Sequence, residues 1–170
     1  ERIAHIVSNL VDFASLKDNV TTMADITESL NGTLKLLENQ LGTCAIELHI
    51  EKLPLTQCNI SSMKQVFVNL LINAKHACDD LHEQQGKITI KLFANKGNIY
   101  IEVADNGCGM DADTLKQMFD PFFTTKPVCQ GTGMGMAIVY NVLKEHNGTI
   151  EVESEVGKGS LIRCVIPITT

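Results

Sequence analysis

Two asparagines in an apolar stretch of this sequence have the type and spacing that suit a metal-bound ligand. Asn69 and Asn73 lie four residues apart, so in a helix both side chains share one face, and His76 falls on the same face. The amide oxygen of Asn73 can ligate Mg²⁺ without adding charge to the site. Taken alone, the pair also fits an ordinary polar helix surface, so it indicates a metal site only together with other segments.

A second segment, Asp105-Asn-Gly-Cys-Gly109, directly follows a predicted strand that ends in Val103 and Ala104. Gly107 and Gly109 allow a flat ligand to approach the backbone closely. A partly buried carboxylate at Asp105 needs a donor partner, and the exocyclic amine of a purine would provide one. The same residues also fit a turn of the Asp-Asn-Gly type that closes a strand.

A third segment, Gly131-Thr132-Gly133-Met134-Gly135, runs directly into a predicted helix. It is not a Walker loop, because no Gly-Lys-Ser/Thr follows, and no strand leads into it at the distance that a dinucleotide fingerprint requires. Its backbone N–H groups at a helix N-terminus suit the binding of phosphate. The alternative is a flexible glycine loop in front of a capped helix.

Between these two segments lies an aromatic stretch, Phe119-Asp-Pro-Phe-Phe123-Thr124-Thr125-Lys126. Its two hydroxyls and its lysine suit a lid over phosphates. The alternative is a hydrophobic plug that anchors a long loop to the core.

The elements that must position these segments follow from hydrophobic periodicity. Ser62 and Gln65 suggest a capping box at a helix start, and Asn95-Lys-Gly97 suits a tight hairpin with a positive φ at the glycine. Spacings of three and four predict helices and strict alternation predicts strands. We expect helices at 2–15, 25–41, 62–82 and 134–146, a helical turn near 112–118, and strands at 45–51, 87–94, 98–104, 149–155 and 160–168. This order predicts a two-layer α/β sandwich, with a mixed, mostly antiparallel sheet covered on one face by helices.

Composition narrows the class of protein. The chain has 170 residues, 44% of them hydrophobic and 20% charged, which is typical of a globular domain. A net charge of −6 argues against nucleic-acid binding, and no apolar run of about 18 residues is present to span a membrane. The six cysteines contain no Cys-X-X-Cys pair, so we expect reduced thiols in a cytoplasmic protein, with three disulfides as the alternative.

Together, the segments resemble the four boxes of the catalytic ATP-binding domain of sensor histidine kinases, within the wider gyrase, heat-shock chaperone and mismatch-repair ATPase group. The matching text is Asn69-Leu-Leu-Ile-Asn73-Ala for the N box, Asp105-Asn-Gly-Cys-Gly-Met110 for the first glycine box, Phe119–Lys126 for the F box, and Gly131-Thr-Gly-Met-Gly-Met-Ala-Ile138 for the second glycine box. The resemblance covers about residues 25–168. It implies the Bergerat ATP-binding fold, with ATP and Mg²⁺ as cofactors.

The resemblance also implies a role for each matching residue. Asn73 would ligate Mg²⁺ and Asn69 would support the catalytic site, while Asp105 would hold the adenine amine. Lys75 and His76 compete as the residue that reaches the phosphates, because the family usually has lysine at the place of His76. The other implied nucleotide-binding residues are Ala77, Gly107, Gly109 and Met110 around the base, Phe123, Thr124, Thr125 and Lys126 in the lid, and Gly131, Thr132, Gly133, Met134 and Gly135 where the lid folds over the triphosphate.

Asn69 favours a kinase over an ATPase. In the hydrolytic members of the group, a glutamate at this place activates water, and a neutral amide is a very poor base. Phosphate should therefore pass to a protein side chain. The chain departs from the family at Met134 and Met136, which replace leucines at similar volume, and at Cys129, which stands where a glycine is common.

The acceptor histidine is expected outside this chain. His5 lies on the predicted N-terminal helix, but its surroundings resemble the second helix of the dimerisation hairpin rather than the first. We therefore expect 1–16 to be a remnant of that hairpin, 17–24 a linker and 25–170 the catalytic domain. The implied partners are ATP or ADP, the receiver domain of a response regulator, and a second copy of the parent kinase, with no nucleic acid and no membrane contact by this part.

Two other functions remain open. One is a nucleotide-binding signalling module without catalysis, although the intact glycines, Asn73 and Asp105 argue against it. The other is an anti-sigma-type serine kinase on the same fold, against which the N-terminal helix argues.

Overall fold

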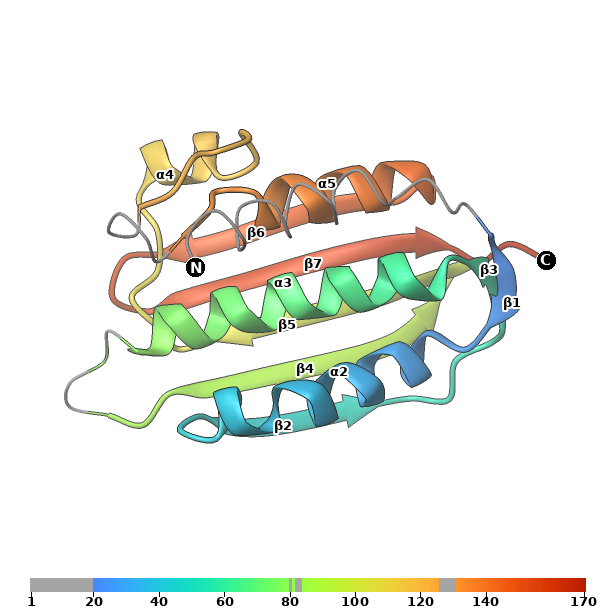
Figure 1. Ribbon diagram of the computed structural model, residues 1–170, viewed down its shortest axis with the longest axis horizontal. Helices are drawn as coiled ribbons and strands as arrows, with labels where there is room; N and C mark the ends of the chain where they lie inside the picture. Colours follow the sequence, from blue (N-terminus) through green and yellow to red (C-terminus); the bar gives the residue numbers. More distant parts are fainter. Residues whose placement is uncertain (1–19, 80, 82–83, 126–130) are drawn as a thin grey trace, which may run out of the picture.

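A five-stranded sheet with helices on one face forms the body of the protein. The computed structural model describes residues 20–79, 81, 84–125 and 131–170. The strands are β2 (Ala45–Ile50), β4 (Lys87–Asn95), β5 (Asn98–Asp105), β7 (Gly159–Pro167) and β6 (Thr149–Glu155), in that order across the sheet. Helices α2 (Ile26–Leu41), α3 (Ile60–Asp79) and α5 (Gly135–Glu145) cover one face (Figure 1). Within this described sheet β2 and β4 pair in parallel and the other neighbouring strands pair antiparallel, so the predicted mixed, mostly antiparallel two-layer sandwich is confirmed.

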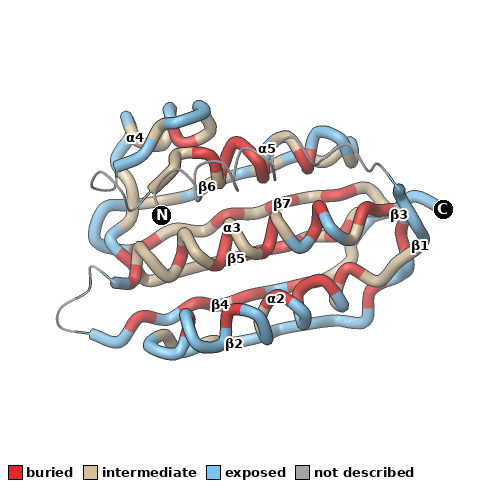
Figure 2. The backbone as a smooth tube through the Cα atoms, viewed as in Figure 1, coloured by how far each residue is buried: buried red, intermediate tan, exposed pale blue. Residues whose placement is uncertain are grey.

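Helix α3 is the central element of the helical layer. It packs against α2 on one side and α5 on the other, and against the sheet below. Phe67, Leu70 and Leu71 are fully buried on it. Figure 2 shows buried residues concentrated along α3 and the inner strands, whereas the edge strand β2 is largely exposed.

The start of α3 differs from the prediction. The helix begins at Ile60, and the side chain of Asn59 accepts the Ser62 N–H at 3.0 Å, so Asn59 and not Ser62 is the cap. Asparagine caps as well as serine does, and Ser62 is buried within the first turn. The helix is described to Asp79, short of the predicted end at 82.

The hairpin between β4 and β5 brings Asp105 to its place. Lys96 and Gly97 both have positive φ, 47° and 79°, as a two-residue turn with the twist of a hairpin requires. The predicted turn is thus confirmed. The register then pairs Asp105, the last residue of β5, with Ile88 of β4 and Ser160 of β7. Asp105 therefore lies at the end of the central strand.

A second, two-stranded sheet was not predicted. Strand β1 (Thr22–Ala24) pairs antiparallel with β3 (Thr56–Cys58). Thr169 fastens β3 to the end of the chain, because its N–H donates to Thr56 Oγ1 at 2.9 Å and its carbonyl accepts the Gln57 N–H at 3.0 Å. Three-residue strands are too short for alternation to reveal them. Part of the segment predicted as a linker, 17–24, is thus a strand, while the predicted helix at 2–15 lies outside the described residues.

The remaining elements match the prediction closely. A short helix, α4 (Ala112–Gln117), is capped by Asp111, whose carboxylate accepts the Thr114 N–H at 2.8 Å. None of the described cysteines, at 44, 58, 78, 108 and 164, forms a disulfide, which agrees with the expected free thiols. Across the part of the chain that the structure describes, no helix combines the length and apolar character needed to cross a membrane.

The core face of α2 gives a matched test of this packing. Leu37 is 4% exposed and the adjacent Leu36 is 72% exposed on the same helix. We expect Leu37→Ala to lower the free energy of unfolding by about 2–5 kcal/mol, because it removes buried methyl groups and leaves a cavity. Leu36→Ala should change it by less than about 0.5 kcal/mol. Urea denaturation of both variants measures the difference, and equal losses would contradict the assigned face of α2.

Candidate functional site

The first glycine box touches the C-terminal half of α3 through its backbone. The Cys108 N–H donates to the carbonyl oxygen of Ala77 at 3.0 Å. A Cβ at Gly107 would lie 2.4 Å from the carbonyl carbon of Ala77 and 2.5 Å from its oxygen, which no side chain can accommodate without movement of the backbone. Glycine at 107 therefore permits a close contact between α3 and the residues that follow β5, and it brings Ala77 and Gly107 together.

Asp105 is partly buried at the end of β5, as its place in the sequence suggests. Its carboxylate accepts the Gly107 N–H at 2.9 Å and a further hydrogen bond from the backbone of Ser160. Burial raises the pKa of this carboxyl above its usual value, and the two backbone donors lower it in part. A carboxylate with two oxygens can accept more bonds than these two. Asp105 is thus a desolvated acceptor suited to a further N–H donor.

Asn106 has a positioning role that the sequence did not reveal. Its Oδ1 accepts the Lys87 N–H at 2.6 Å, and its Nδ2 donates to the Gln85 carbonyl at 3.1 Å. Its own N–H donates to the Lys87 carbonyl at 3.2 Å. These bonds fasten the first glycine box to the start of β4. A turn-forming asparagine gives no sequence signal that would distinguish this role.

The turn between β6 and β7 closes the other side of the first glycine box. Gly109 has φ +68°, and a Cβ there would lie 2.0 Å from the Glu155 carbonyl oxygen. The Met110 N–H donates to Ser154 Oγ at 2.8 Å, and the Gly157 N–H donates to the Cys108 carbonyl at 2.8 Å. This contact was not predicted, because it joins segments more than 40 residues apart in the sequence.

The N box and the second glycine box are also adjacent. Asn69 Nδ2 donates to the Gln65 carbonyl at 2.9 Å, and a Cβ on Gly135 would lie 2.8 Å from Asn69 Oδ1. Gly135 is the first residue of α5, so the N-terminus of α5 lies beside the middle of α3 (Figure 1). Asn73 lies one turn further along α3 and is half-buried.

Lys75 and His76 differ in their surroundings on α3. The Lys75 ammonium forms an ion pair with Asp79 one turn further on. His76 is half-buried on the helix.

The F box packs on the second glycine box. The Phe122 N–H donates to the Gly133 carbonyl at 3.0 Å, and Gly133 has φ +66° with its missing Cβ 2.3 Å from the Phe122 carbonyl carbon. The rings of Phe119 and Tyr140 lie 5.8 Å apart, which joins the F box to α5. Phe119 is half-buried, which supports the hypothesis that it anchors the loop to the core as a hydrophobic plug. Phe122, in contrast, is 68% exposed.

The other predicted residues of this region lie around that contact. Met134 is buried, and its N–H donates to Thr132 Oγ1 at 3.4 Å. Gly131 and Phe123 are half-buried, and Thr124 and Thr125 are exposed. Lys126 and Cys129 lie outside the described residues.

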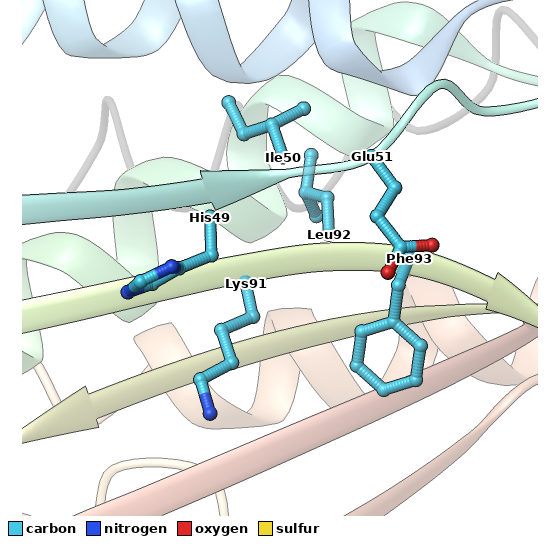
Figure 3. Close-up of a pocket in the computed structure, with 6 residues that line it drawn as sticks. All are labelled: His49, Ile50, Glu51, Lys91, Leu92 and Phe93. Carbon is cyan, nitrogen blue, oxygen red and sulfur yellow. The ribbon is translucent and has the colours of Figure 1, made fainter.

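A surface hollow lies apart from the predicted site residues. It has a volume of about 320 Å³ and lies at strands β2 and β4, lined by His49, Ile50, Glu51, Lys91, Leu92 and Phe93 (Figure 3). None of the predicted site residues lines it. Ligand sites combine shape with a few convergent polar groups. The three segments that meet at α3 supply these groups, and we place the candidate site there.

Comparison with known proteins identifies relatives of this chain. The family described as histidine kinase-, DNA gyrase B- and HSP90-like ATPase matches residues 58–170. Sensor histidine kinase ZraS of Klebsiella oxytoca is 34% identical over an alignment 173 residues long, which covers 99% of this chain and 36% of that protein. Sporulation kinase E of Bacillus subtilis (strain 168) is 31% identical over an alignment 172 residues long, which covers 99% of this chain and 22% of that protein.

Solved structures share the fold. The catalytic domain of histidine kinase ThkA, in a nucleotide-free form, superposes with a TM-score of 0.76 at 25% identity, covering 88% of this chain and 97% of that domain. The present chain spans only about a third or less of the length of the two curated relatives described above. The family match covers the N box and both glycine boxes together. The chain therefore belongs to the histidine kinase-, DNA gyrase B- and HSP90-like ATPase family.

Proposed function

We propose that this chain is the catalytic ATP-binding domain of a sensor histidine kinase. It holds Mg-ATP and delivers the γ-phosphate to a histidine outside this chain, for relay to the receiver domain of a response regulator. One observation carries the proposal: both glycine boxes converge on α3, the first at Ala77 and the second at Asn69. Membership of the ATPase family and the likeness to sensor histidine kinases support it.

The purine end of the proposed site lies at the first glycine box. Asp105 accepts the adenine amine, and Gly107 and Gly109 let the loop after β5 pack closely against the backbones of Ala77 and Glu155 beside the base. Burial raises the pKa of Asp105. The same partial burial strengthens a hydrogen bond that the carboxylate accepts. Ala77 and Met110 contribute apolar walls.

The phosphate end lies where α3 meets α5. The residues from Gly131 to Gly135 supply backbone N–H groups, and α5 adds the positive end of its dipole. Asn73 has the neutral oxygen that Mg²⁺ accepts, and it lies one turn from the contact between Asn69 and Gly135. When bound, Mg²⁺ would neutralise charge on the phosphates. Phe123, Thr124, Thr125, Thr132, Met134 and Lys126 belong to the lid, and His76 lies on the α3 side.

Asn69 directs the chemistry toward transfer rather than hydrolysis. Its side-chain nitrogen donates to the Gln65 carbonyl, and its oxygen lies against Gly135. An amide held in this way cannot remove a proton from water, because it is a very poor base. Phosphoryl transfer then depends on positioning and charge stabilisation, which suits an acceptor that another domain brings in.

The division of the chain follows from this proposal. Residues 25–170 form the catalytic domain, 17–24 the connection and 1–16 part of a dimerisation hairpin of a cytoplasmic kinase module. A nucleotide-sensing module without catalysis is the second candidate, and the third experiment below separates the two.

The first prediction concerns the base. We expect Asp105→Asn to weaken ADP binding by about 10- to 100-fold, because a hydrogen bond to a charged acceptor is lost. GDP carries an oxygen where adenine has its amine, so it should bind the wild-type chain poorly. Its affinity should change little in Asp105→Asn. Calorimetry of both nucleotides gives the ratio. Asp113→Asn, at an exposed carboxylate of α4, is the matched control and should bind ADP as wild type does. Unchanged ADP affinity in Asp105→Asn would contradict the assignment.

The second prediction concerns the metal. Asn73→Asp places a negative charge beside the phosphates and alters the Mg²⁺ ligand. We expect the affinity for Mg-ADP to fall by about 10-fold or more and its dependence on Mg²⁺ concentration to change. ADP titrations at several Mg²⁺ concentrations measure both. Asn31→Asp, on the exposed side of α2, adds the same charge elsewhere and should have no effect. If affinity and metal dependence stay the same in Asn73→Asp, Asn73 is not the ligand.

The third prediction concerns the acceptor. The chain should bind Mg-ATP but should not label itself from γ-labelled ATP, because the sequence around His5 resembles the second helix of the hairpin and not the helix that carries the acceptor. The preceding helix of the parent kinase, added as a longer chain, should restore acid-labile phosphohistidine. Stable label on His5 would contradict the proposed division. Nucleotide binding with no transfer in the longer chain would favour the sensing module.

A further inference from the structure

Two cysteines from different elements bring their sulfurs together beside the first glycine box. Cys44 lies in the connection between α2 and β2, and Cys78 lies in the last turn of α3. Their thiols are hydrogen-bonded to each other. A Cβ at Gly86 would lie 3.1 Å from Cys44 Sγ and 3.2 Å from Cys78 Sγ. The absence of a side chain at Gly86 thus leaves one small space that both sulfurs occupy.

The two thiols differ in their access to solvent. Cys44 is half-buried and lines a surface hollow of about 310 Å³ with apolar walls at the end of α2. Cys78 is 5% exposed. Burial, together with the neighbouring Cys44, raises the pKa of the Cys78 thiol to about 12. Because Cys44 is the more accessible of the two sulfurs, an oxidant from solvent should reach Cys44 before Cys78.

We propose that Cys44 and Cys78 form a reversible intrachain disulfide when the folded chain meets a peroxide. Cys44 attacks the peroxide, the O–O bond breaks, and Cys44 becomes a sulfenic acid with release of one water. Cys78 sulfur then attacks Cys44 sulfur, the S–S bond forms and the S–OH bond breaks. The leaving hydroxide takes the Cys78 proton as a second water. The two thiols together give two electrons, which reduce one hydrogen peroxide.

The disulfide would join the end of α3 to the connection between α2 and β2, next to the first glycine box. Cys78 directly follows Ala77, whose carbonyl accepts the Cys108 N–H of the first glycine box. Two acceptors lie within reach of the single Cys78 S–H proton, Asn106 Oδ1 at 3.6 Å and the Lys87 carbonyl at 3.9 Å from the sulfur. The covalent bond would replace these weak donations and tie the end of α3 to the connection between α2 and β2. The inference does not depend on the proposed kinase activity.

The other described cysteines lie in surroundings different from those of Cys44 and Cys78. Cys58 and Cys164 are buried in β3 and β7, and Cys108 is exposed in the first glycine box. Cys58 therefore offers a matched control, because burial raises its pKa too but it belongs to another element.

The test treats the 170-residue chain with equimolar hydrogen peroxide without denaturant, blocks remaining thiols with an alkylating reagent and maps the peptides. We expect a linked pair of peptides containing Cys44 and Cys78, with loss of two hydrogen atoms. The linkage should persist in Cys58→Ala and vanish in Cys44→Ser and Cys78→Ala. Because a disulfide that fits the folded state constrains the unfolded chain, the oxidised protein should melt about 5–15 °C higher, and dithiothreitol should reverse the shift.

Three results would overturn the proposal. One is peroxide treatment that leaves Cys44 as a sulfinic acid with Cys78 still free. Another is a linkage that joins Cys108 or Cys129 to either residue instead. The last is a linked Cys44–Cys78 pair with a lowered melting temperature, since it would show that the bond forms only outside the native fold.

Discussion

The contact between the backbone of the first glycine box and the Ala77 carbonyl on α3 fixes the geometry on which the rest of this site depends. At Gly107 the two backbones approach so closely that a single methyl group would not fit. This contact sets the distance between the end of β5 and the helix layer. Asp105 lies two residues before it on the strand side, and Asn73 lies one turn before it on the helix side. The same contact thus fixes the positions of both the proposed purine acceptor and the proposed metal ligand.

Other parts of the fold hold that contact in place. Asn106 joins the glycine box to the start of β4, and the β6–β7 turn lies against Gly109 from the other side. Gly135 approaches Asn69 in the same manner two turns earlier on α3. Glycines at these positions serve close approach rather than flexibility. A chain with a net charge of −6 must bind an anionic ligand through such local backbone donors, because the overall field opposes the approach of the anion.

The sequence predicted the motifs and the regular elements well, because both depend on local information. Alternation and helical spacing located the five strands of the main sheet and the three covering helices, and Asn95-Lys-Gly97 located the hairpin. The cap of α3 was misassigned because Ser62 and Asn59 are both good caps, and burial decided between them. Strands β1 and β3 were missed because three residues carry no periodicity. The roles of Asn106, Ser154 and Phe122 could not be predicted, since each depends on a partner distant in the sequence.

Amide chemical shifts of the chain titrated with Mg-ADP test the location of the site most directly. If the nucleotide binds where the three segments meet at α3, the largest shifts should occur at Asn73, Gly107, Gly109 and Gly135. The residues of the hollow on β2 and β4, His49 and Lys91 among them, should stay unchanged. Shifts concentrated at that hollow, with the glycine boxes unaffected, would contradict the account.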